Sequence, residues 1–412
     1  MTDRRKDPDR PEAICPAGTE GNPFVPRCDD FDEWLRTPVA SSSPDPRIEV
    51  RQAQPAEFDR IYDLVDAAFG FKRPWALNEW AYRRNPYGLA RCWVSVDRAT
   101  GRYVGASAHW PWPLARGMSP LTGAQGGDSV LLHEWRHQGV HDVARQIRES
   151  HPWVRSIVSY SWPNAASVRR ISKQRRATRL IGALPSRVLP LQARAYLARR
   201  GLPRAASTLT GRLLDSLFTS WSTWVLQRPF DGHVEQIGRF DSAFDEVTRR
   251  CMAWEGYWSP HAAEFLNWRY RQDPVREHLA FALVVDSKLT AYSVVRVGPE
   301  RAHLMEFAIP PEQPQAARAL LLHTIRAAAA ADCAQLEVAA PPGWRHWPLV
   351  RAAGFMRRPS TLVMQIIAWG DDPGVQTLEN WQILGGDLDP FYDSPRGAAD
   401  ATALSHPIRH GV

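Results

Sequence analysis

From residue 47 onward, hydrophobic and polar positions follow regular periods. Residues 47–53 (RIEVRQA) alternate as in a β-strand, and residues 55–70 (PAEFDRIYDLVDAAFG) repeat apolar positions with the spacing of an amphipathic helix. A second short helix contains residues 80–86 (WAYRRNP), and residues 92–110 (CWVSVDRATGRYVGASAHW) predict a hairpin that turns near Gly101. The pattern therefore predicts an α/β fold.

This helix-and-hairpin unit occurs twice. Residues 80–86 (WAYRRNP) and 268–274 (WRYRQDP) both fit W-x-Y-R-x-[ND]-P, and the second copy leads into another hairpin at residues 279–297. Residues 154–164 and 334–344 each predict a buried strand that ends near proline and is followed by a basic helix. A shared motif within the same order of elements predicts tandem copies of one domain.

We expect each domain to be a central mixed, mostly antiparallel sheet flanked by helices. The predicted segments are a disordered tail and linker (1–46), a first domain (47–190), a helical linker (191–230), a second domain (231–392) and a flexible tail (393–412). The linker has an apolar i, i+4 stripe, which indicates packing between the halves or, as the alternative, contact with a membrane surface.

Composition is that of a soluble globular protein, with 44% hydrophobic and 23% charged residues. Five scattered cysteines without a C-x-x-C pair favour a reduced, cytoplasmic setting. No apolar run reaches the about 18 residues of a membrane helix, and the N-terminus has no signal-peptide core. We therefore expect a cytoplasmic protein without an integral membrane segment, and the sequence leaves its oligomeric state open.

The net charge of +7 is unevenly distributed. Between Glu149 and Asp215 the chain has no acidic residue and many arginines. This run either attracts an anionic partner, such as a phosphorylated cofactor, or forms solvated helix faces.

Residues 133–141 (HEWRHQGVH) admit two interpretations. As H-E-x-x-H they would place His133 and His137 on one helical face as zinc ligands. A third ligand is then required, but no carboxylate lies between Glu149 and Asp215, and a glycine at 139 would weaken the helix. As a loop that opens a helix, the same residues would present unpaired N–H groups to a phosphate. We favour the phosphate loop and expect no metal.

Residues 128–139 (DSVLLHEWRHQG) resemble the acyl-CoA-binding stretch of the GNAT superfamily of N-acyltransferases, which in many bacterial members runs approximately D-T-A-V-H-P-E-Y-R-G-R-G. Asp128, Glu134, Trp135, Arg136 and Gly139 fall in register. The family's N-x-x-[AS] pattern after the next strand is matched by Asn164 and Ser167. The resemblance covers residues 47–190 well and 231–390 more faintly.

This resemblance implies acetyl-CoA or another acyl-CoA as co-substrate. The implied cofactor-binding residues are Leu131, His133, Arg136, His137, Gln138, Gly139, Val140, His141, Asn164 and Ser167.

The resemblance also implies a catalytic machinery. A backbone N–H in the Leu131–His133 stretch would polarise the thioester carbonyl. Asp128 is the candidate base, with a structural role in a turn as the alternative. At the position where the family commonly has a tyrosine as the general acid, this chain has Ile171, so Tyr160 becomes the candidate general acid.

The second half departs further from the family. It retains the family-like ending A-A-G-F, but its loop, EFAIPPEQPQAARA (306–319), has three prolines and lacks arginine and glycine at the phosphate positions. Because proline has no N–H, we expect this half to shape the acceptor site instead of binding CoA. The W-x-Y-R motif recurs in both halves, so we interpret it as a packing module. Asp387 and Asp389 indicate a turn more readily than a metal site.

The expected function is an acyl-CoA-dependent N-acyltransferase, most simply an acetyltransferase acting on a small-molecule or glycan amine, such as an amino sugar in surface polysaccharide synthesis. One alternative is a Fem-like aminoacyl transferase that uses charged tRNA, the only nucleic-acid partner we consider. The other is a catalytically inactive GNAT pair that acts as a binding module, which the departures at His141, Ile171 and Arg175–Arg176 favour.

Overall fold

The computed structural model describes most of the chain between residues 34 and 391. The described residues are 34–37, 45–172, 178–192, 211, 214, 220–251, 256–298, 300–368 and 372–391. Most of the predicted N-terminal tail and helical linker, the Arg175–Arg176 pair and the tail at 393–412 lie outside them. Among the described residues, no helix has the length and apolarity needed to cross a bilayer.

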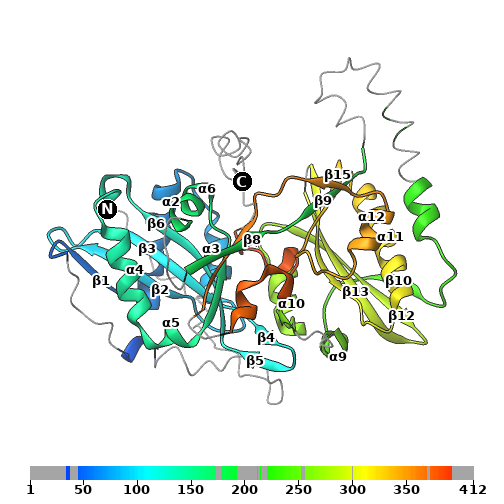
Figure 1. The fold of residues 1–412 in the computed structure, drawn as a ribbon, viewed down its shortest axis with the longest axis horizontal. Helices are drawn as coiled ribbons and strands as arrows, with labels where there is room; N and C mark the ends of the chain where they lie inside the picture. The colour runs from blue at the N-terminus through cyan, green and yellow to red at the C-terminus, as the bar shows by residue number, and fades with distance from the viewer. Residues whose placement is uncertain are drawn as a thin grey trace, which may run out of the picture.

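The first sheet has seven strands with the helices on both faces (Figure 1). In sheet order its strands are β1 (Ile48–Gln52), β2 (Arg91–Asp97), β3 (Tyr103–Pro111), β6 (Gly123–Leu131), β7 (Val158–Ser161), β17 (Val363–Ile367) and β8 (Thr178–Ala183). Only β6 and β7 pair in parallel. The helices are α2 (Phe58–Phe69), α3 (Trp75–Arg83), α4 (Val140–Ser150), α5 (Pro152–Ser156) and α6 (Ala165–Ile171), with 3-10 turns η1 (Pro55–Glu57) and η2 (His133–Trp135).

The second sheet repeats this order of pairings. Its strands are β10 (His233–Ile237), β12 (Glu277–Val285), β13 (Lys288–Val297), β14 (Arg301–Ala308), β15 (Gln335–Ala339), β9 (Ser186–Pro190) and β16 (Met356–Arg358). The parallel pair is β14 and β15. Its helices are α9 (Ser242–Cys251), α10 (Ala263–Tyr270), α11 (Pro314–Ala330) and α12 (Trp347–Ala352). The predicted mixed, mostly antiparallel sheets flanked by helices are confirmed.

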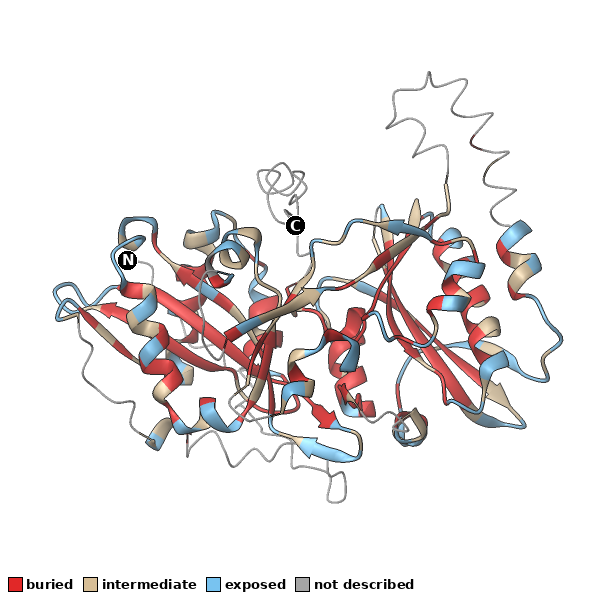
Figure 2. Cartoon of the chain, in the orientation of Figure 1, coloured by how far each residue is buried: buried red, intermediate tan, exposed pale blue. Residues whose placement is uncertain are grey.

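A third, four-stranded sheet joins the two halves. It contains β4 (Leu114–Arg116) and β5 (Ser119–Leu121) from the first half and β11 (Tyr257–Trp258) and β18 (Trp381–Gln382) from the second. The C-terminal segment around it forms the 3-10 turns η3 (Pro373–Gln376), η4 (Leu378–Asn380) and η5 (Gly385–Asp387). Strand and helix surfaces that face the interior are buried on both sides of this junction (Figure 2).

The two large sheets exchange one strand each. Strand β9 follows β8 in the chain but pairs with β15 and β16 of the second sheet, and Figure 1 shows this connection crossing the middle of the molecule. Strand β17 from the C-terminal half lies between β7 and β8 of the first sheet. A division at residue 190 therefore does not separate the sheets. Within the predicted disordered tail, Trp34 is buried against Trp93, so this part of the tail is packed.

The repeated W-x-Y-R motif lies at the centre of the junction. Trp80 and Trp268 stack with ring centroids 4.7 Å apart, and each indole N–H donates to the other residue's carbonyl, at 2.9 and 3.1 Å. Both side chains are fully buried. The structure agrees with the packing interpretation of this motif.

Candidate functional site

The HEWRHQG segment is a turn and a loop that lead into α4. His133–Trp135 form the 3-10 turn η2, Arg136 is extended, His137 has a φ of 63°, and α4 begins after Gly139, whose φ is 80°. The H-E-x-x-H residues therefore do not share a helix, and the geometry required by the zinc interpretation is absent. A positive φ at position 139 explains the glycine there.

The loop presents backbone N–H groups at the positive end of α4. Within the described part of the chain, the N–H groups of residues 137–140 donate no hydrogen bond. A Cβ added at Gly139 would meet nothing within 4 Å, so the space beside it is open. Unpaired N–H groups at a helix N-terminus are suited to binding an anion such as a pyrophosphate.

Several of the predicted cofactor residues hold this loop in shape. The Arg136 guanidinium donates to the Leu131 carbonyl at 3.1 Å. The Gln138 side chain donates to the Glu134 carbonyl at 2.5 Å and accepts from Arg47 at 2.9 Å. These contacts fix the loop through side chains and leave its N–H groups available.

The remaining predicted residues surround the loop and the start of α6. His133, His137 and Gly139 are exposed, Val140 is buried, and His141 lies 3.4 Å from Ser129. Across the parallel strand pair, Asn164 accepts from the Ser167 N–H at 2.9 Å and caps α6.

Strands β6 and β7 separate beside this loop. Their parallel pairing ends at Gly126 and Ser161, while β6 continues to Leu131. A bulge shifts the register of β6 against β3 at this point, and Asp128 in the bulge has a φ of 46°. One N–H group of the stretch predicted to polarise the thioester carbonyl already has a partner, because the Leu132 N–H donates to the Val104 carbonyl at 2.8 Å.

Asp128 is held in a buried ion pair. Its carboxylate accepts from Arg73 at 2.6 and 2.9 Å and from the Tyr82 hydroxyl at 2.6 Å. Both oxygens of this buried carboxylate therefore already accept hydrogen bonds from within the protein. The geometry therefore favours the structural alternative, in which Asp128 fixes the bulge.

Tyr160 contacts the C-terminal segment. Its buried hydroxyl donates to the Asp387 carbonyl at 3.3 Å, and burial raises the pKa of Tyr160 well above its ordinary value. The same carbonyl accepts from Gln125 at 2.6 Å and from Trp162 at 3.2 Å. These three donors position the segment that contains Asp387.

Comparison with known proteins bears on the fold. No family model and no curated protein matches the sequence. A conserved Enterococcus faecalis V583 protein, titled a probable N-acyltransferase, has a similar structure with a TM-score of 0.56, 10% identity, and coverage of 78% of this chain and 73% of that one. A GCN5-related N-acetyltransferase from Anabaena variabilis ATCC 29413 has a TM-score of 0.54 and 9% identity, and the match covers 78% of this chain and 72% of that one. A GCN5-related N-acetyltransferase from Kribbella flavida has a TM-score of 0.51 and 13% identity, and the match covers 77% of this chain and 71% of that one. The chain has the GNAT fold.

Within this GNAT fold, Asp389 lies beside the bulge. A Cβ added at Gly127 would be 3.2 Å from the Asp389 Oδ2 atom, and Asp389 is only half-buried. Its Oδ1 accepts from the Phe391 N–H at 2.7 Å, and the Phe391 ring stacks on Arg73 at 3.9 Å. Asp389 is thus a carboxylate at the strand opening that the sequence pattern assigned only to a turn.

The second half has a counterpart of the Arg73–Tyr82–Asp128 cluster. His261 and Tyr270 follow Arg73 and Tyr82 at the same spacing of 188 residues that separates Trp80 from Trp268. The Tyr270 hydroxyl donates to Glu306, and the His261 Nδ1 atom lies 2.8 Å from Glu306. Each half of the GNAT fold therefore has a cluster of a basic side chain, a tyrosine and a carboxylate. The carboxylate lies on β6 in the first half and on β14 in the second.

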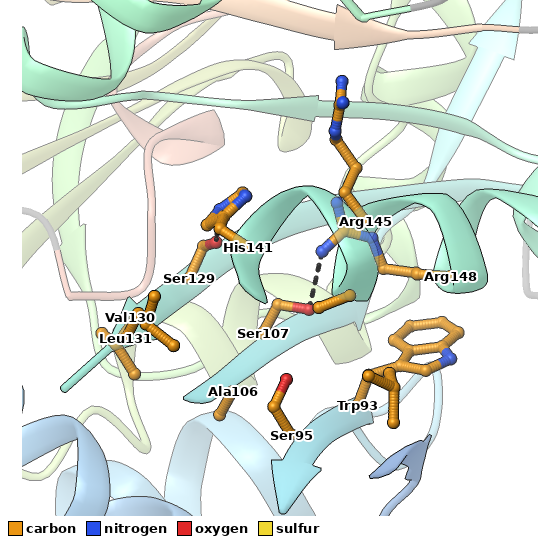
Figure 3. Close-up of a pocket in the computed structure, with 12 residues that line it drawn as sticks. Trp93, Ser95, Ala106, Ser107, Ser129, Val130, Leu131, His141, Arg145 and Arg148 are labelled. Atoms are coloured by element: carbon orange, nitrogen blue, oxygen red, sulfur yellow. Dashed lines mark hydrogen bonds between the residues drawn. The ribbon is translucent and has the colours of Figure 1, made fainter. Parts of the chain in front are cut away.

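A small cavity lies under α4 (Figure 3). Its volume is about 20 Å³, and polar side chains line it, with Arg148 donating to Ser107 at 2.8 Å and Ser129 beside His141. About 10–15 Å³ of such volume holds one water molecule. The cavity is too small for a cofactor, and it lies between the strands and α4, away from the exposed loop of residues 133–139. We therefore do not assign the co-substrate to it.

Proposed function

We propose that the protein is an acyl-CoA-dependent N-acyltransferase whose first sheet binds the CoA ester. The observation that carries this proposal is the loop of unpaired N–H groups before α4, placed beside the point where β6 and β7 separate. The solved structures with this fold that are named above carry titles of N-acyl- or N-acetyltransferases.

The described residues suit each part of such a co-substrate. The N–H groups of residues 137–140 would bind the pyrophosphate, with the exposed Arg136 adding positive charge. The part of β6 beyond Gly126, which has no partner in β7, would run along the pantetheine chain. The thioester would then lie at the bulge, beside Asp389.

In the reaction, the amine nitrogen attacks the thioester carbonyl, the C–S bond breaks and an amide forms. The thiolate of CoA leaves and takes up a proton from solvent. We assign to Asp389 the proton lost by the amine, because this half-buried carboxylate lies beside the bulge, whereas the Asp128 carboxylate is buried. Asp389 also interacts electrostatically with Arg73. The acceptor class is a primary amine, and amino sugars belong to it.

The binding step is tested by thermal shift with acetyl-CoA. We expect acetyl-CoA to raise the Tm of the wild type but not of Gly139→Glu, because the new carboxylate would occupy and repel the phosphate position. Gly101→Glu is the matched control, since Gly101 also has a positive φ (66°) and open space around its Cβ. Equal stabilisation of both variants would disprove the loop assignment.

The chemical step is tested by thiol release with a panel of amines, amino sugars included. We expect Asp389→Asn to lower kcat by about 10²- to 10⁴-fold while acetyl-CoA still raises the Tm. Glu379→Gln, an exposed carboxylate nearby in sequence, is the control. Acetyl-CoA binding without thiol release from any amine would identify a binding module, and turnover with aminoacyl-tRNA alone would identify an aminoacyl transferase.

A further inference from the structure

The second half contains a cavity of about 80 Å³ at the position that corresponds to the separation of β6 and β7 in the first half. The pairing of β14 with β15 ends at His303 and Glu337, and the cavity lies beyond this point. It is lined by the end of β14, by the loop after β15, by α9 and by the C-terminal segment, including Glu306–Ile309, Trp344–His346, Thr248, Cys251 and Gln382.

This cavity is not suited to a second CoA ester. The loop that follows β14 contains Pro310, Pro311 and Glu312, and α11 begins at Pro314. Proline provides no N–H for a phosphate, and Glu312 would repel it. A volume of about 10–15 Å³ per water molecule means that about six water-sized groups fit. The occupant must therefore be small.

One group of residues that lines the cavity carries negative charge. Glu306 accepts from His261 and from Tyr270 through its Oε1 atom, and among the described residues its Oε2 atom has no hydrogen-bond partner. His261 lies between Glu306 and Asp387, at 2.8 and 3.1 Å. One imidazolium between two carboxylates leaves one net negative charge, which favours a cationic group of a ligand.

Another residue that lines the cavity, Arg345, carries a positive charge. Arg345 donates to the Ile309 carbonyl and contacts His346 at 3.2 Å, but it forms no ion pair with any described residue. Trp258, Phe307 and Trp344 also line the cavity and add apolar surface to it. Apolar walls with a few convergent polar groups are typical of small-molecule sites.

We propose that this cavity binds a free α-amino acid, whose ammonium group contacts Glu306 and whose carboxylate contacts Arg345. Both charges of such a zwitterion are then paired, and a small side chain packs against the tryptophans. The site is separate from the proposed acyl-CoA site, because the Asp387 carbonyl accepts from Gln125 and Trp162 of the first half while its carboxylate contacts His261. The proposal does not depend on acyl transfer.

The test is isothermal calorimetry and thermal shift of the full chain with the twenty amino acids, with methylamine and acetate as probes that carry one charge each. We expect at least one small amino acid to bind and to raise the Tm, and neither single-charge probe to do so. Arg345→Gln should weaken binding by at least about tenfold, because a charge-assisted hydrogen bond is lost.

Arg357→Gln, another exposed arginine without an ion pair among the described residues, is the matched control and should bind as the wild type does. Glu306→Gln should also abolish binding. Because Glu306 is buried, this variant can fail to fold, and Arg345→Gln then tests the proposal on its own. Gly139→Glu should retain amino-acid binding, which separates this proposal from the acyl-CoA site. The absence of binding by every amino acid, or unchanged affinity in Arg345→Gln, would overturn the proposal.

Discussion

At the scale of single residues, the two halves use different cations for the same purpose. Arg73 pairs with Asp128 in the first half, and His261 lies between Glu306 and Asp387 in the second. A guanidinium is charged at every ordinary pH, whereas an imidazole can lose its proton. The second cluster is therefore the one whose stability depends on pH.

The pKa of His261 indicates the direction of that dependence. Burial lowers this pKa, but Glu306 and Asp387 together raise it from 6.5 to about 10. Because the pKa is higher in the folded chain, the proton stabilises the fold fully below pH 6.5, and the contribution is lost as the pH rises towards 10.

We therefore expect the free energy of unfolding to decrease between pH 6.5 and 10, measured by urea unfolding. In His261→Gln this part of the decrease should be absent. His233→Gln is the control, because His233 is exposed and its nearest carboxylate, Glu235, is 3.9 Å away. A wild type and a His261→Gln variant with parallel pH profiles would contradict the assignment.

At the scale of elements, the sequence predicts local structure well and the sheet order only in part. The hairpins, the motif helices and the helix after Gly139 follow from periodicity and from glycine, and the structure contains all of them. Strands β9 and β17 are short segments of five residues each, and a local period carries no information on which sheet accepts them. Their exchange depends on contacts between segments far apart in sequence.

The same limit applies to the site. The loop from His133 to Gly139 is contiguous, so its pattern was recognisable. Asp389 reaches the bulge from a segment more than 250 residues away in the chain, so no local pattern could assign it there. Asp128 was found by its position in a motif, but its partner Arg73 is visible only in the fold.

The exchanged strands predict how the chain tolerates a cut. If the chain is divided after residue 200, between β9 and β10, each fragment keeps a strand that belongs to the other fragment's sheet. We expect neither fragment to be soluble alone, because each sheet then lacks an internal strand and exposes unpaired edges. Co-expressed fragments should purify together and show the wild-type circular dichroism spectrum. A soluble, cooperatively unfolding single fragment would show that the halves are independent.

At the scale of the whole molecule, the junction behaves as core and not as a contact between two domains. The largest buried cluster combines residues of α3 with Phe265, Trp268 and Trp381 from the second half. The Asp387 carbonyl accepts from the first half, while its carboxylate contacts His261 of the second half. Exchanged strands, a shared small sheet and a shared core predict that the described chain unfolds as one cooperative unit.

The stacked Trp80 and Trp268 provide a measurement of that coupling. Each Trp→Phe change removes an N–H donor and leaves a buried carbonyl of the other half unpaired, at a cost of about 1–3 kcal/mol. Because each indole N–H donates to the other residue's carbonyl, loss of one indole shifts the backbone that carries the acceptor of the second bond. In a double-mutant cycle by urea unfolding, we therefore expect a coupling energy of at least about 0.5 kcal/mol between them. The pair Trp80 and Trp224 is the control and should be additive, because Trp224 is 66% exposed and its ring contacts Trp221, with centroids 5.5 Å apart. Additive behaviour of Trp80 and Trp268, or two separate unfolding transitions in the wild type, would mean that the halves are joined by the chain and not by a common core.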